Sequence, residues 1–243
     1  MARADHRLVE PLEITRGDYL GPRFAPDGRE LLVTGPQLRG LYLASLAGGV
    51  RLLTDDAEAG VHARWSTDGS ISFRALRAGT RRDLAVTRQG QVRTQVPAAP
   101  LAFTKDDRFY VTDRTGRLAR IGSGDRFFSA VVAPDGDKVV VQGLATGLHV
   151  YTRSTGTLVH IGPGTAPAWS PDSARLVYEV TEDDGHDLVA SDLYLYTVAT
   201  DTAQPLTATD RVLERRPSFS PSGTSIAFDD NTGGIYVGRL EIR

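Results

Sequence analysis

The sequence predicts an all-β protein made of six small antiparallel sheets, because one short phrase recurs six times in 243 residues. Each copy has an aromatic residue or valine, then a small residue, then a turn rich in Pro, Asp or Gly. The six lead residues are Phe24, Trp65, Phe103, Val132, Trp169 and Phe219. A repeat of about 40 residues with strand-like flanks is typical of a four-stranded propeller blade. We therefore expect a six-bladed β-propeller that forms a single domain over residues 1–243.

The turn after each lead residue has a local explanation. Proline presets φ, the Asp side chain accepts a hydrogen bond from the backbone N–H two residues on, and glycine takes the positive φ of the turn. We interpret the repeated aspartates as scaffold, in preference to catalytic or metal-binding groups: Asp27, Asp68, Asp135 and Asp172. The lead aromatics are interpreted as packing residues between neighbouring sheets.

Short apolar runs such as Leu31–Val33 and Val139–Val141 predict central strands that are covered on both faces. No apolar period of 3.6 residues is sustained, so we expect no long helix. Strands of the first two units are expected at residues 22–26, 30–34, 41–46, 50–54, 62–66, 71–75, 83–87 and 92–96.

The third unit is the shortest, since only 29 residues separate Phe103 from Val132. It has room for strands at residues 101–103, 108–112 and 117–121. A rudimentary fourth strand is expected near Arg126–Phe128, and a three-stranded sheet would also fit.

The final unit has predicted strands at residues 216–220, 225–228 and 234–240, one fewer than a full blade. The opening stretch, residues 9–15, resembles the outer strands at residues 203–207 and 50–54. We therefore expect the N-terminal strand to complete the last blade, which would remove open sheet edges.

Composition narrows the classes of function. The chain has no Cys, which excludes disulfides, thiol catalysis and Cys-ligated zinc. A net charge of −2 argues against a nucleic-acid partner or a polybasic membrane anchor. No apolar run approaches the roughly 18 residues of a membrane span, so we expect no membrane insertion. The opening residues predict a cytoplasmic protein, or a periplasmic one if a signal peptide has been removed.

The repeats resemble the Pro-Asp variant of WD-type repeats found in TolB-like propellers. Units five and six carry the resemblance most clearly, through Pro167–Asp172 followed by Arg175–Tyr178, and Pro217–Gly223 followed by Ser225–Phe228. The resemblance implies six blades and binding, commonly of a protein or peptide, at one mouth of a central channel. TolB itself is exported and has an additional N-terminal domain, and neither feature is visible in this sequence.

Two features fall on the face predicted to carry the links between units. The first is a set of basic residues near the lead residues: Arg23, His62, Arg64, Arg126, Arg215 and Arg216. Guanidinium groups bind carboxylates bidentately, so this set predicts recognition of an acidic peptide segment or a chain terminus. The alternative interpretation is that these arginines pair with Asp or Glu of adjoining units.

The second feature is an acidic insertion over residues 182–192, which accounts for the longest spacing. Glu182, Asp183, Asp184 and His186 could ligate Ca²⁺ or another divalent metal. The spacing matches no EF-hand, and the alternative is that Asp184 and His186 fix the loop by local hydrogen bonds. No cofactor is otherwise expected.

Catalytic motifs find little support, because Ser66, Ser170 and Ser220 lie in the structural phrase and no Gly-rich phosphate loop is present. The sequence therefore favours a non-enzymatic module that binds a protein or peptide. Two alternatives stay open: a metal-assisted hydrolase or lyase that uses the acidic insertion, and a structural propeller that self-associates.

Overall fold

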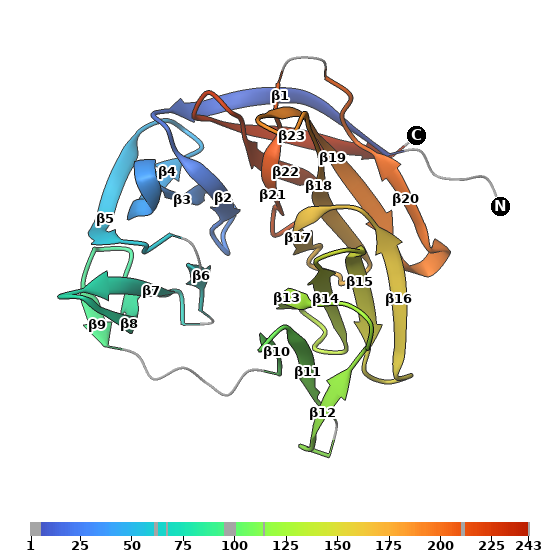
Figure 1. Ribbon diagram of the computed structural model, residues 1–243. Coiled ribbons are helices and arrows are strands. Elements are labelled where there is room, and N and C mark those ends of the chain that lie inside the picture. The colour runs from blue at the N-terminus through green and yellow to red at the C-terminus, as the bar shows by residue number, and fades with distance from the viewer. Residues whose placement is uncertain are drawn as a thin grey trace. The chain divides into compact units, whose positions relative to one another are not determined.

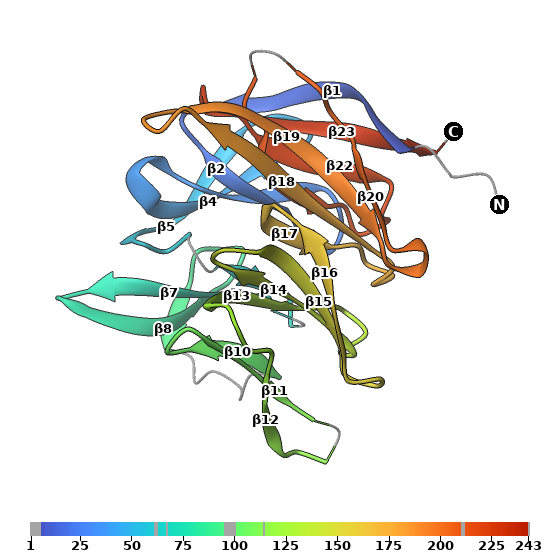
Figure 2. The same cartoon turned by 45° about the vertical axis from the view of Figure 1, so that its right-hand side comes forward.

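The computed structural model describes residues 6–60, 63–66, 68–94, 101–113, 115–209 and 212–242. The chain divides into two compact units: the first contains Met1–Ala98 and Val212–Arg243, the second Ala99–Arg211. Almost every element is a strand (Figures 1 and 2), apart from the short 3-10 turns η1 (Pro36–Leu38) and η2 (Val198–Thr200). The all-β prediction is confirmed, whereas the single-domain boundary stays a prediction. No helix in the described ranges is long and apolar enough to span a membrane.

In the first unit, the final sheet is completed by the opening strand. Its strands are β21 (Arg215–Phe219), β22 (Ser225–Asp229), β23 (Gly234–Ile242) and β1 (His6–Arg16), in the order β1-β23-β22-β21. β1 runs antiparallel to β23 from the pair His6↔Ile242 to the pair Arg16↔Gly234 (Figure 1). The predicted completion of the last sheet by the N-terminal strand is confirmed.

The rest of the first unit contains two further four-stranded groups. One has β2 (Leu20–Phe24), β3 (Glu30–Thr34), β4 (Arg39–Ser45) and β5 (Val50–Ala57). The other has β6 (Arg64–Trp65), β7 (Ile71–Arg77), β8 (Thr80–Val86) and β9 (Val92–Thr94). A single pair, Ala57↔Leu76, joins the two groups into one hydrogen-bonded sheet.

The second unit has one three-stranded and two four-stranded sheets. The first contains β10 (Ala102–Lys105), β11 (Arg108–Thr112) and β12 (Leu118–Ile121). The second contains β13 (Phe127–Val132), β14 (Lys138–Gly143), β15 (Gly147–Thr152) and β16 (Thr157–Gly162). The third contains β17 (Thr165–Trp169), β18 (Arg175–Asp183), β19 (Leu188–Thr197) and β20 (Thr202–Pro205).

Two details of the second unit differ from expectation. The rudimentary fourth strand near Arg126–Phe128 is wrong, because Phe127 and Phe128 begin β13 and pair with β14. Phe127 is 4 % exposed and packs with Phe109 of the earlier sheet and with Val139 and Val141 of the later one, so its ring lies in a core that both sheets share while its backbone pairs with β14. The acidic insertion is mostly not a loop, since it lengthens the β18–β19 hairpin as far as the pair Asp183↔Leu188.

The predicted turn chemistry is confirmed. Backbone N–H groups two residues on donate to Asp27, Asp68, Asp135 and Asp172 over 2.8–3.1 Å. Gly28 and Gly136 have φ of 71° and 67°, which side-chain-bearing residues rarely adopt. Three of the lead residues, Phe24, Trp169 and Phe219, are at most 9 % exposed.

A repeated β-bulge was not predicted. The residue three positions before the lead has positive φ in four repeats: Gly21, Ser129, Ala166 and Arg216. The strand register shifts at the same places in β2, β13, β17 and β21. A bulge bends its strand and re-aims the side chains beside it, so it determines where the basic residues near the lead position point.

Candidate arginine site

Arg23 on β2 and Arg64 on β6 occupy the same place in two consecutive repeats, directly before Phe24 and Trp65. Both belong to the first unit. Among the described residues, no side chain forms a hydrogen bond or an ion pair with either guanidinium, and no carboxylate contributes to the electrostatic environment of either group. Two arginines without carboxylates therefore stand near each other.

The local environment penalises both charges. Loss of hydration and, to a smaller extent, the positive charge of Arg64 together lower the pKa of Arg23 to about 10. Desolvation also lowers the pKa of Arg64, although that side chain is exposed to solvent. The side chain of Arg64 is thus reached by water, while nearby protein atoms replace part of its hydration shell. An anion bound there would offset both the desolvation and the repulsion.

Arg216 has a different environment. Its guanidinium donates from Nε to Asp229 Oδ1 over 2.9 Å and from Nη2 to Oδ2 of the same carboxylate. Asp229 is fully buried and also accepts the backbone N–H of Gly21 at 3.0 Å. This cluster ties β21 and β22 to β2. Arg215 is half-buried and stands opposite Asp229 in the strand register.

Two more basic residues were predicted to belong to the site, Arg126 and His62. Arg126 donates from Nε to Asp107 Oδ2 at 2.8 Å, an exposed ion pair with the preceding hairpin. His62 lies outside the described residues. The structure therefore brings together Arg23 and Arg64, and it gives Arg126 and Arg216 the carboxylate partners of the alternative interpretation.

The acidic residues of the β18–β19 hairpin are engaged with its turn. Asp183 Oδ1 accepts the N–H of Gly185 at 3.0 Å, and Asp184 Oδ1 accepts those of His186 and Asp187 at 2.9 and 2.8 Å. These bonds lower the pKa of Asp184. In the part of the chain that is described, no three His, Asp or Glu side chains are grouped to hold a metal. Local hydrogen bonding, the alternative for Asp184, is thus observed.

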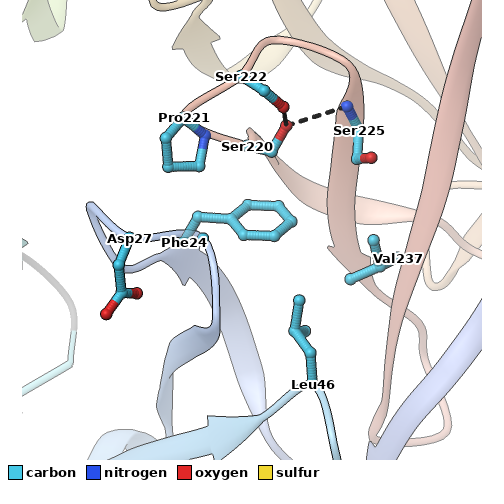
Figure 3. Close-up of a pocket in the computed structure, with 9 residues that line it drawn as sticks. Phe24, Asp27, Leu46, Ser220, Pro221, Ser222, Ser225 and Val237 are labelled. Carbon is cyan, nitrogen blue, oxygen red and sulfur yellow. Dashed lines mark hydrogen bonds between the residues drawn. The ribbon is translucent and has the colours of Figure 1, made fainter.

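Sequence reasoning missed a cavity of about 500 Å³ in the first unit, drawn in Figure 3. It is lined by Phe24, Asp27, Gly28, Leu46, Ser220, Pro221, Ser222, Ser225 and Val237. Its polar groups already have partners, because Ser220 Oγ accepts Ser225 N–H at 3.0 Å and Asp27 pairs with Arg88 at 2.7 Å. Two copies of the repeated turn supply most of the lining, so the repeat itself was the available signal.

Comparison with known proteins decides the fold. No family model and no curated protein matches the sequence. A gluconolactonase from Xanthomonas campestris superposes with a TM-score of 0.64 at 12 % identity, covering 98 % of this chain and 94 % of that one. An oligogalacturonate lyase from Vibrio parahaemolyticus superposes with a TM-score of 0.53 at 15 % sequence identity, covering 98 % of this chain and 97 % of the lyase chain. A chain of the mitotic checkpoint complex superposes with a TM-score of 0.55 at 14 % sequence identity, covering 98 % of this chain and 93 % of that one.

The fold is a β-propeller. The predicted fold class is therefore confirmed, with the small sheets described above as its blades. At 12–15 % identity the likeness concerns the fold alone. Because two enzymes and a chain of a protein assembly share this architecture, the fold alone does not select a function.

Proposed function

We propose that this propeller is a non-enzymatic, TolB-like recognition module that binds an acidic segment of a protein or peptide through Arg23 and Arg64. The observation that supports this proposal is the pair of desolvated arginines for which no described residue supplies a carboxylate. A strained, like-charged pair is the arrangement expected where a ligand provides the missing charge. The two forked guanidinium groups suit carboxylates, which they bind bidentately.

The alternative of a metal-assisted hydrolase or lyase has weaker support. Its tentative ligands Asp183 and Asp184 are already used by the amides of their own turn. The activities for which the gluconolactonase and the lyase are named belong to those proteins. Nothing in the geometry of the arginine pair calls for either chemistry.

Calorimetric titration with a synthetic peptide of about ten residues, rich in glutamate, tests the proposal. The variant Arg23→Gln/Arg64→Gln should bind at least about tenfold more weakly, since each charge-assisted hydrogen bond contributes about 1.5–3 kcal/mol. Binding to the unmodified protein should weaken as salt is raised, because charge drives it.

Arg82→Gln is the matched control. Arg82 is exposed on β8 in the same unit and forms no ion pair with a described residue, so its removal changes the net charge without touching the pair. Its affinity for the peptide should equal that of the unmodified protein. Equal affinity of the double variant and the unmodified protein would refute the proposal.

A further inference from the structure

Among the described residues, the sheet β10-β11-β12 has three strands, whereas the other two sheets of the second unit have four. In those sheets β16 and β20 lie outside the third strands β15 and β19. β12 is a third strand too, but it forms the edge of its sheet (Figure 1). An open edge can pair with an extended polypeptide.

The strand register identifies the main-chain groups that an added strand would meet. Asp113 N–H donates to Arg117 C=O at 2.8 Å, so the pair 113↔117 is hydrogen-bonded. Hydrogen-bonded and non-hydrogen-bonded pairs alternate along antiparallel strands, which makes 112↔118 and 110↔120 non-hydrogen-bonded pairs. The N–H and C=O groups of Leu118 and Arg120 therefore point away from β11. No backbone group in the described ranges bonds to them from the outer side.

Side-chain burial shows that this edge is incomplete. Leu118 on β12 is 51 % exposed. The residues at the same register position of the other third strands, His149 on β15 and Tyr194 on β19, are only partly exposed. An apolar third-strand side chain is thus uncovered in the sheet without a fourth strand.

The charge of the edge indicates the occupant. Arg117 and Arg120 are exposed and form no ion pair with a described residue, although the positive charge of Arg117 is close enough to help lower the pKa of Asp113. β12 of a second copy would add two more arginines to the same short edge, and this accumulation of like charge disfavours self-pairing. We propose that an extended acidic segment of a partner protein adds to β12 as the fourth strand of this sheet. Main-chain bonds at Leu118 and Arg120 supply the affinity, and the two arginines select acidic side chains.

A peptide of about ten residues that alternates valine and glutamate is the probe, since an added strand of this length spans β12 with overhang. The experiment uses the Arg23→Gln/Arg64→Gln background, so that the site of the proposed function does not contribute. Hydrogen exchange of the amides of Leu118 and Arg120 should slow when the peptide is added. A valine–lysine peptide should leave their exchange unchanged.

Leu118→Pro removes one outward N–H without touching the bonds to β11, and it should weaken peptide binding about tenfold. Leu118→Thr keeps that N–H and should change affinity less than about threefold. Equal binding by the proline and threonine variants would overturn the proposal, as would the absence of binding at about 1 mM peptide. Self-association through β12 in sedimentation would also overturn it, because a second copy would then be the occupant.

Discussion

Arg216 and the pair Arg23–Arg64 differ in two respects: Arg216 lies three residues before its lead residue and the pair directly before theirs, and only Arg216 has a carboxylate partner among the described residues. Arg216 meets the buried Asp229, which lies ten residues after the lead residue of its repeat. The residue ten positions after the lead is Thr34 in the first repeat and Ala75 in the second. In the last repeat the acidic residue at that position holds Arg216 as a structural arginine. In the first two repeats that position is not acidic, and Arg23 and Arg64 lack an acidic partner among the described residues.

The largest expected effect concerns the compensated arginine. Asp229→Asn leaves the charge of Arg216 without its carboxylate in the interior and weakens the acceptor of Gly21 N–H. Loss of one member of a buried pair costs about 3–5 kcal/mol of unfolding free energy. Urea denaturation measures this loss.

Asp83→Asn is the matched control for that measurement. Asp83 pairs with Arg74 at 2.9 Å, with both side chains at least 35 % exposed. Its loss should cost less than about 1 kcal/mol, because solvent already screens the pair. Similar losses for the two variants would contradict the distinction between the buried and the exposed acid.

A smaller effect on the unfolding free energy is expected at His149, where the surroundings also disfavour a positive charge. His149 on β15 faces His160 on β16, with ring centroids 4.9 Å apart. Burial lowers the pKa of His149 below 6.5, the charge of His160 lowers it further, and Asp125 opposes the shift. The unfolded chain therefore takes up the proton first, and stability should fall as pH drops through 6.5 until it levels off below the folded pKa.

His149→Gln should flatten this acid dependence relative to the unmodified protein in urea titrations at a series of pH values. An unchanged pH profile in the variant would assign the loss to other groups.

The smallest effect is expected at the exposed pair Arg126–Asp107, whose side chains are 66 % and 55 % exposed. Arg126→Gln should change the unfolding free energy by less than about 1 kcal/mol. It should also leave binding of the glutamate-rich peptide unchanged. Weaker binding in this variant would enlarge the recognition site beyond Arg23 and Arg64.

The sequence was sufficient for most of the fold, because each repeat carries its own turn chemistry. The expected strand 30–34 matches β3, and the N-terminal strand joins β23 as predicted. The bulge at Ser129, Ala166 and Arg216 escaped prediction, since only Gly21 among these positions is a residue that favours positive φ. At Ser129, Ala166 and Arg216 the left-handed backbone goes against local propensity, so the surrounding fold must hold it.

The candidate site was predictable only as a set of basic residues. Which arginines have partners depends on pairs such as Arg216 and Asp229, thirteen residues apart, that meet only when the bulge is formed. The acidic hairpin illustrates the same limit. Its composition predicts a metal site, whereas the fold directs Asp184 to the amides of His186 and Asp187.

The central claim is that Arg23 and Arg64 are held at a cost to stability for the sake of an acidic ligand. The most direct test compares the unfolding free energy of the unmodified protein and of Arg23→Gln/Arg64→Gln, with and without the glutamate-rich peptide. Without peptide the variant should be the more stable, because repulsion and desolvation are relieved. At a free peptide concentration of about ten times Kd, the peptide should stabilise the unmodified protein by about 1.4 kcal/mol. The difference in unfolding free energy between the two proteins should then shrink or change sign. A variant that is less stable without peptide, and equally stabilised by it, would contradict the account.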